Sequence, residues 1–180
     1  MTTTVEQRSI RRVVVLADVA GVALATVVVL LGVTVWADIV STYDSWPQWL
    51  LFGALATVGQ LAFVKVRHGA TDEELTFFEV VLAAAVFTLH PVAALTVTLV
   101  GMLLGELIIR REPIKLAYNL GMYAAGTSAM IITYRVLFPN DSASAFSLHS
   151  VLSLVTSSIV FTMVNLVILA RLMHVTMGLP

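Results

Sequence analysis

The chain has 180 residues, of which 59% are hydrophobic and only 12% are charged, and its mean hydropathy is +0.96. Soluble domains carry about 25% charged residues, so this composition is typical of membrane proteins. The net charge of −1 without a basic face argues against nucleic-acid binding, and the absence of cysteine excludes disulfides, iron–sulfur clusters and thiol chemistry.

The first two apolar runs each predict a membrane-spanning helix. Such a helix needs about 20 mostly apolar residues, and Val13–Val35 is the first run that suffices. This run is longer than the apolar part of a signal peptide and has no clear cleavage site, so we expect it to remain as a helix. Trp49–Val64 is the second, and Ser45-Trp46-Pro47 before it is typical of a helix start.

The middle of the chain holds one run, Phe77–Ile109, that is too long for a single crossing. One helix of that length would measure about 50 Å at 1.5 Å per residue, whereas the hydrocarbon core is about 30 Å thick. We therefore predict two helices with a tight turn near His90-Pro91. Thr71-Asp72-Glu73-Glu74 has the pattern of a capping box, which predicts that the third helix begins early, at Thr71.

Two further helices complete the predicted fold. Ile114–Phe138 lies between Pro113 and Pro139, and Leu148–Ala170 precedes the stop signals Gly178 and Pro180. The sequence thus predicts an all-α, polytopic membrane bundle of six helices, with five as the fallback. The expected organisation is an N-terminal segment 1–12, a transmembrane domain 13–171 and a C-terminal end 172–180.

The basic residues predict the orientation. Every Lys and Arg except Arg135 lies in a segment that the six-helix arrangement places on one side. Because cytoplasmic loops are enriched in Lys and Arg, both termini are expected to be cytoplasmic. Arg135 lies near the outer end of the fifth helix, where it can extend toward the interface or serve a site.

Several polar side chains fall inside the predicted helices, within about two turns of their cytoplasmic ends. Ionisable groups in transmembrane helices are costly and often functional. One interpretation is an interior cluster for ligand binding or coupling. The other is interfacial helix ends that pair locally, as in the i,i+4 pairs Glu106–Arg110 and Lys115–Asn119. These candidates are Asp18, Glu79, Glu106, Lys115, Asn119 and Asn165, with Gln60 at similar depth.

The outer half offers His90 and Arg135 as further candidates for a binding or coupling site. His90 before Pro91 is typical of a turn residue, and one His without a partner at ligand spacing predicts no metal site. Ser157 and Ser158 have no adjacent base that could activate them, so a role as catalytic nucleophiles has little support. We therefore expect neither catalytic residues nor a cofactor.

Small residues at four-residue spacing mark expected helix contacts, because they let backbones approach closely in lipid. The fourth helix carries Gly101 and Gly105. Similar stripes are Ala17, Gly21, Ala25 on the first helix and Gly121, Ala125, Ala129 on the fifth. They indicate packing within the bundle or, alternatively, a homodimer or a protein partner.

Two stretches resemble a known class of domain. The segment from Gly101 to Asn119, with Arg-Arg-x-Pro-x-Lys-x-x-x-Asn at its end, and the final Val164-Asn165 resemble the multi-helix membrane input domains that precede GGDEF or HD-GYP domains in bacterial signalling proteins. The resemblance covers roughly residues 75–175. It implies a sensor in the bacterial cytoplasmic membrane that relays ligand, lipid or membrane state to a cytoplasmic output domain or partner. Because the sequence reaches Pro180 without such an output domain, it is expected to be either the membrane part of a longer protein or a module that acts alone.

The alternative is a transporter subunit. The length and the small-residue stripe on the first helix resemble the S components of energy-coupling-factor transporters, which bind a vitamin or a metal ion, although Gly21 interrupts the alanine pattern. This alternative predicts a polar pocket open to the outside. A membrane enzyme is disfavoured because no catalytic constellation is recognisable. In every case the lipid bilayer is the expected partner.

Overall fold

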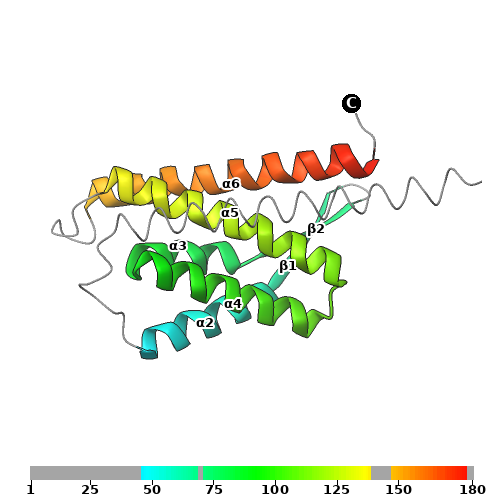
Figure 1. Ribbon diagram of the computed structural model, residues 1–180, viewed down its shortest axis with the longest axis horizontal. Coiled ribbons are helices and arrows are strands. Elements are labelled where there is room, and N and C mark those ends of the chain that lie inside the picture. Colours follow the sequence, from blue (N-terminus) through cyan, green and yellow to red (C-terminus); the bar gives the residue numbers. More distant parts are fainter. Residues whose placement is uncertain (1–45, 69–70, 139–146, 178–180) are drawn as a thin grey trace, which may run out of the picture.

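The computed structural model describes residues 46–68, 71–138 and 147–177. The predicted helix Val13–Val35, with Asp18 on it, lies outside these ranges. Within them the chain is helical, as predicted, with one β-hairpin (Figure 1). Its elements in chain order are α2 (Trp46–Leu61), β1 (Phe63–His68), β2 (Thr71–Thr76), α3 (Phe78–Thr88), α4 (Pro91–Ile109), α5 (Pro113–Leu137) and α6 (Leu148–Met177).

The predicted turn at His90-Pro91 is confirmed, because α3 ends at Thr88 and α4 starts at Pro91. Helices α4 and α5 both begin with Pro, which suits a first helical position where the backbone N–H has no partner. Helix α5 matches the predicted Ile114–Phe138 within one residue at each end. Helix α6 begins at the predicted Leu148 and continues past Ala170 to Met177.

The prediction for residues 62–76 was wrong. Helix α2 stops at Leu61 instead of Val64, and the predicted capping box at Thr71 is a strand of an antiparallel hairpin. The register pairs Lys65 with Glu74 and Arg67 with Asp72. Opposite charges at paired positions favour strand pairing, and Val64–Arg67 alternates apolar and basic residues as a strand does. Helix α3 consequently has only 11 residues.

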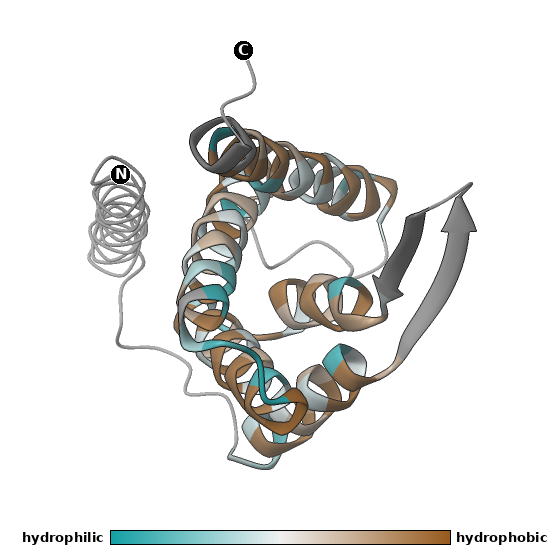
Figure 2. Cartoon of the chain, turned by 90° about the vertical axis from the view of Figure 1, so that its right-hand side faces the viewer, coloured by the Kyte–Doolittle hydropathy of each residue, from teal (hydrophilic) through white to brown (hydrophobic). Residues whose placement is uncertain are grey.

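The helices lie side by side, and α3 contacts each of the other four described helices. Helix α2 packs on α4, α4 on α5 and α5 on α6, so that these four form an arc around α3 when viewed end-on (Figure 2). The hairpin, the α4–α5 connection and the C-terminal part of α6 lie at the same end of the bundle (Figure 1). We call this end, which carries Lys65, Arg67, Arg110, Arg111, Lys115 and Arg171, the charged end.

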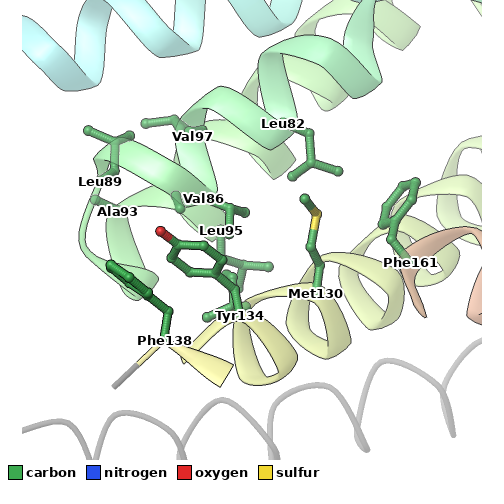
Figure 3. Close-up of a cluster of buried hydrophobic side chains, with 13 residues drawn as sticks. Leu82, Val86, Leu89, Ala93, Leu95, Val97, Met130, Tyr134, Phe138 and Phe161 are labelled. Carbon is green, nitrogen blue, oxygen red and sulfur yellow. The ribbon is translucent and has the colours of Figure 1, made fainter. Parts of the chain in front are cut away.

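The main apolar core lies away from the charged end, between α3, α4 and α5 (Figure 3). Leu82 and Val86 of α3, and Leu89 just after it, pack here with Met130 and Tyr134 of α5. A smaller cluster of Ala56, Phe78 and Met102 lies between this core and the charged end. The two clusters hold α3 against its neighbours through close packing of their side chains.

Two of the described helices, Pro91–Ile109 and Leu148–Leu172 within α6, are long and apolar enough to cross a membrane. Helices α2 and α3, with 16 and 11 residues, fall short of the roughly 20 residues that a crossing needs. Helix α5 has 25 residues but is less apolar, with Asn119, Thr127 and Arg135 along it. The described helices therefore leave six crossings as a prediction.

Candidate functional site

Glu106 lies in the last turn of α4 on the face that turns inward. Gly101, Met102 and Gly105 share this buried face, whereas Leu104 and the three residues after Glu106 are exposed. The Glu106 side chain is only 1% exposed. Burying a carboxylate costs free energy unless it is paired and hydrogen-bonded. The neighbours of Glu106 are therefore central to its role.

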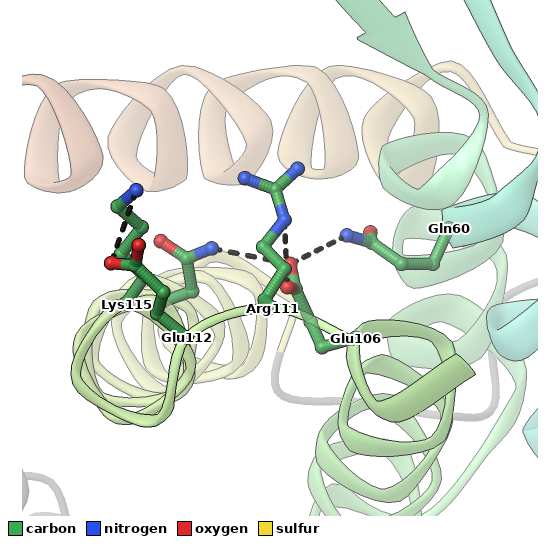
Figure 4. A network of polar contacts seen from close by, with 6 residues as sticks. Gln60, Glu106, Arg111, Glu112 and Lys115 are labelled. Carbon is green, nitrogen blue, oxygen red and sulfur yellow. Dashed lines mark hydrogen bonds and ion pairs between the residues drawn. The ribbon is translucent and has the colours of Figure 1, made fainter. Parts of the chain in front are cut away.

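Glu106 has three partners from different parts of the fold (Figure 4). Gln60 Nε2 on α2 donates to Glu106 Oε1 at 3.0 Å, and Asn119 Nδ2 on α5 donates to the same oxygen at 3.2 Å. Arg111 Nε forms an ion pair with Glu106 Oε2 at 2.9 Å. Together, Gln60, Glu106, Arg111 and Asn119 form what we call the Glu106 cluster, which ties α2, α4 and α5 together at the charged end.

The backbone at the end of α4 brings Arg111 onto Glu106. Arg110 has a left-handed conformation, with φ 59° and ψ 44°. Its N–H donates to Leu107 O, and the N–H of Arg111 donates to Glu106 O. This is the hydrogen-bond pattern of a Schellman motif, which usually has Gly at the left-handed position. The predicted i,i+4 pair Glu106–Arg110 is therefore wrong, because the turn presents the next residue to the carboxylate.

Close packing of α2 and α4 positions Gln60. A Cβ atom added to Gly105 would lie 2.7 Å from Gln60 Cγ, and one added to Gly101 would lie 2.4 Å from Ala56 Cβ. Real Cβ atoms essentially never approach other atoms so closely. The predicted close approach through Gly101 and Gly105 is confirmed, and it allows the Gln60 amide to reach Glu106.

A cavity of about 240 Å³ adjoins the Glu106 cluster. Gln60 is buried, and its Oε1 atom accepts no hydrogen bond from any described residue. The amide orientation follows from chemistry, because an ionised carboxylate only accepts hydrogen bonds and therefore takes the Gln60 NH₂ group. The residues that line the cavity are Gln60, Thr76, Glu79, Met102, Glu106, Arg111, Asn119, Met122 and Tyr123.

Helix α5 connects this cluster to α6. Tyr118 Oη donates to Ile168 O of α6 at 2.6 Å, next to Asn119, which binds Glu106 on α4. A second contact between α5 and α6 lies further from the charged end, where the ring centroids of Tyr123 and Phe161 are 5.6 Å apart. Polar contacts at the charged end thus form a continuous series from α2 through α4 and α5 to α6.

The structure brings together three of the predicted site residues. Glu106 and Asn119 are hydrogen-bonded, and Glu79, exposed in the first turn of α3, lines the same cavity. The sequence predicts the depth of Gln60 correctly but does not mark it as a candidate. Arg111 is not among the candidates from the sequence, which gives no clear signal for it, since Arg110 occupies the position where a turn of this type usually has Gly.

Other candidates lie elsewhere. Lys115 forms an exposed pair with Glu112 at 3.3 Å, so its predicted pairing with Asn119 is wrong. Asn165 packs against α5, where a Cβ added to Gly126 would lie 2.6 Å from Asn165 Oδ1, and that oxygen has no hydrogen-bond partner among the described residues. His90 precedes α4 and Arg135 lies in the last turn of α5, both at the end opposite the Glu106 cluster.

The serines of α6 are bound to their own helix. Ser157 Oγ donates to Ser153 O at 2.6 Å and Ser158 Oγ to Leu154 O at 2.9 Å, so neither hydroxyl is arranged for nucleophilic attack. Within the described ranges, no group of three or more His, Cys, Asp or Glu side chains lies where it could hold a metal ion. Comparison of the chain with protein-family models, with curated proteins and with solved structures found no match.

Proposed function

We propose that the chain is a membrane-embedded input module, in which the Glu106 cluster couples the state of the cavity to the arrangement of the helices at the cytoplasmic side. The observation that carries this proposal is the position of the buried Glu106 carboxylate, which binds Gln60 of α2 and Asn119 of α5 at the charged end. A polar group that joins three helices beside a cavity is suited to transmit a change in one helix to the others.

Embedding in the bilayer is supported by the side chains on the outside of α6. Only 17% of the most apolar stretch within Leu148–Leu172 is buried in the bundle, against 50% of the corresponding stretch within Pro91–Ile109. Soluble monomers rarely expose apolar patches of more than a few hundred Å², whereas lipid is a suitable environment for such a face. The large apolar residues exposed on α6 are Leu148, Val151, Leu152, Val155, Ile159, Met163, Leu166, Val167 and Leu169.

The six-crossing topology with cytoplasmic termini belongs to the same proposal. Among the described basic residues, only Arg135 lies away from the charged end (Figure 1). By the positive-inside rule the charged end is then cytoplasmic. Helix α3 is about 17 Å long at 1.5 Å per residue, so within a hydrocarbon core of about 30 Å it reaches only part of the way across.

The mechanism is a shift between two packings of the bundle. A change that weakens the hold of Glu106 on Gln60 or Asn119 alters how α2 and α5 sit against α4. Because Tyr118, next to Asn119, binds the Ile168 carbonyl, a displacement of α5 reaches the cytoplasmic half of α6. An output domain or partner protein would sense the position of this part of α6.

The location of the cavity favours this proposal over the transporter subunit. An S component needs a pocket open to the outside, but the cavity of the Glu106 cluster lies at the charged end. The opposite end is filled by the apolar core around Leu89, Ala93 and Phe138.

Distance measurements between spin labels test the coupling. The chain has no native cysteine, so Leu107→Cys on α4 and Leu169→Cys on α6, both exposed, place one label on each helix. In lipid nanodiscs we expect Glu106→Gln, which removes the ion pair with Arg111, to shift or broaden the distance distribution between the labels. Glu112→Gln, which changes an exposed carboxylate of the α4–α5 connection, is the matched control and should leave it unchanged. Identical distributions in all three proteins would overturn the proposal.

A further inference from the structure

The cavity beside Glu106 has an excess of negative charge, and one of its lining residues has an unpaired hydrogen-bond acceptor. Its charged lining residues are Glu79, Glu106 and Arg111, which leaves one net negative charge when Arg111 offsets Glu106 at 2.9 Å. None of the described residues forms an ion pair with Glu79. Gln60 adds a buried carbonyl oxygen without a donor. A ligand that only donates hydrogen bonds and carries a positive charge matches these groups.

The remaining walls and the volume limit the size of such a ligand. Met102, Met122 and the ring of Tyr123 give the cavity an apolar side. Its volume of about 240 Å³ equals that of about eight water molecules at roughly 30 Å³ each, and lies below the 300–1,000 Å³ of pockets for drug-sized ligands. The cavity therefore suits a head group with a short hydrocarbon chain.

We propose that this cavity binds a primary ammonium group on a short hydrocarbon chain. An ammonium group has three N–H donors and no acceptor, so it can donate to the Glu79 carboxylate and, once the buried Gln60 amide turns toward the cavity, to Gln60 Oε1, while the chain lies along the two methionines. An anion would meet the excess negative charge of the lining. This inference rests on the proposed function, since it names the chemical class of the signal that the module receives.

Two sources supply this chemistry at a membrane surface, and the experiment separates them. One is a free small amine, and the other is the ethanolamine head group of a phospholipid. The full chain is placed in phosphatidylcholine nanodiscs, whose lipids have no primary ammonium group, and is titrated with butylammonium in a calorimeter. A second set of nanodiscs contains phosphatidylethanolamine. Weaker butylammonium binding in the second set identifies the lipid head group as a competitor, and equal binding identifies the free amine.

We expect saturable binding of butylammonium and none of two compounds with the same number of carbon atoms, the anion butyrate and the neutral alcohol butan-1-ol. Glu79→Gln should weaken binding by about tenfold or more, because a charge-assisted hydrogen bond is lost. This variant should fold, since Glu79 is exposed in the first turn of α3. Glu112→Gln, at the same end but outside the cavity lining, should bind like the unmodified chain.

Absence of saturable binding in phosphatidylcholine, equal binding of butan-1-ol, or wild-type affinity in Glu79→Gln would each overturn the inference. The spin-label distances keep this result separate from the coupling proposal. If butylammonium binds but no distance changes, with ligand or in Glu106→Gln, the binding site stands and the input function fails. If butylammonium does not bind but Glu106→Gln changes the distances, the coupling stands and the ligand class is wrong.

Discussion

Tyr118 and Asn119 are consecutive residues of α5, yet their side chains donate hydrogen bonds to helices on opposite sides. Tyr118 Oη binds Ile168 O of α6 at 2.6 Å, and Asn119 Nδ2 binds Glu106 Oε1 of α4 at 3.2 Å. Adjacent positions on a helix point about 100° apart, so one turn of α5 can bridge two neighbours. The stability of the charged end should therefore depend on few side chains.

Removing the cation of the Glu106 cluster should destabilise the fold. Breaking a fully buried ion pair costs about 3–5 kcal/mol, but Arg111 is 37% exposed, so we expect Arg111→Leu to lower the free energy of unfolding by about 1–3 kcal/mol. Lys115→Leu is the control, because the Lys115–Glu112 pair is exposed on both sides and should contribute little. Thermal unfolding in detergent measures both. Equal melting temperatures for the two variants would contradict the burial of Glu106.

The two asparagines should respond differently to the same change. Asn119→Leu removes a donor from the buried Glu106 carboxylate, so we expect a loss of about 0.6 kcal/mol, the average for interhelical hydrogen bonds in membranes, or more. Asn165→Leu should cost less, because Asn165 Oδ1 is buried without a hydrogen bond and its removal relieves an unsatisfied polar atom. Unfolding midpoints in the same detergent compare the pair. A larger loss for Asn165→Leu would show that this amide has the more important partner.

Replacing Arg110 by Gly should stabilise the chain, because it removes the strain of a left-handed backbone at the end of α4. Arg110 has φ 59°, a conformation that costs an L-residue about 1–2 kcal/mol and that Gly adopts freely. Part of this gain is offset by the greater freedom of Gly in the unfolded chain, so Arg110→Gly should raise the free energy of unfolding by about 1 kcal/mol. Arg111→Gly is the contrasting variant and should lower it. No increase for Arg110→Gly would mean that the arginine side chain offsets the strain.

Enlarging Gly105 should disrupt the contact between α2 and α4. An added Cβ atom would lie 2.7 Å from Gln60 Cγ, and overpacking typically costs about 1–3 kcal/mol. We expect Gly105→Leu to lower the melting temperature in detergent. Gly53→Leu is the matched control, since an added Cβ atom at Gly53 meets nothing within 4 Å. If both variants melt alike, the helices do not approach each other as closely as described.

Reporter fusions test the orientation. We expect fusions after Asp44, His90 and Asp141 to report an exterior location, and fusions after Arg67, Arg111 and His174 to report a cytoplasmic one. The physical reason is the concentration of Lys and Arg at the charged end. A cytoplasmic signal from the fusion after His90 would exclude the α3–α4 hairpin as a double crossing.

The sequence predicts the parts of this fold in which one signal dominates. Pro91 and Pro113 begin helices because their N–H groups would have no partner there, and long apolar runs set the extents of α4 and α5. The hairpin was missed because Thr71–Glu74 satisfies the capping-box pattern as well as it satisfies a strand that pairs with a basic partner. Only the pairing of β1 with β2, a contact between separate segments, decides between them.

The candidate site also contains residues that the sequence predicts and residues that it does not. The depths of Glu106 and Asn119 follow from their positions along the helices, and the structure joins the two residues. The choice of Arg111 over Arg110 depends on a single left-handed residue, which the sequence does not indicate because Gly is the usual residue there. Asn165 does not join them, because α6 continues to Met177 and places this residue against Gly126, about two turns along α5 from Asn119.

The shortness of α3 has a consequence for the assembly of the protein. With 11 residues, α3 is too short for the membrane-insertion machinery to recognise as an independent segment, since recognition depends on about 20 apolar residues. Only Leu89 and His90 separate it from α4, which is long and apolar enough on its own. In the proposed topology the two helices therefore enter the bilayer as one unit during synthesis, with α4 supplying the apolarity that carries α3 with it.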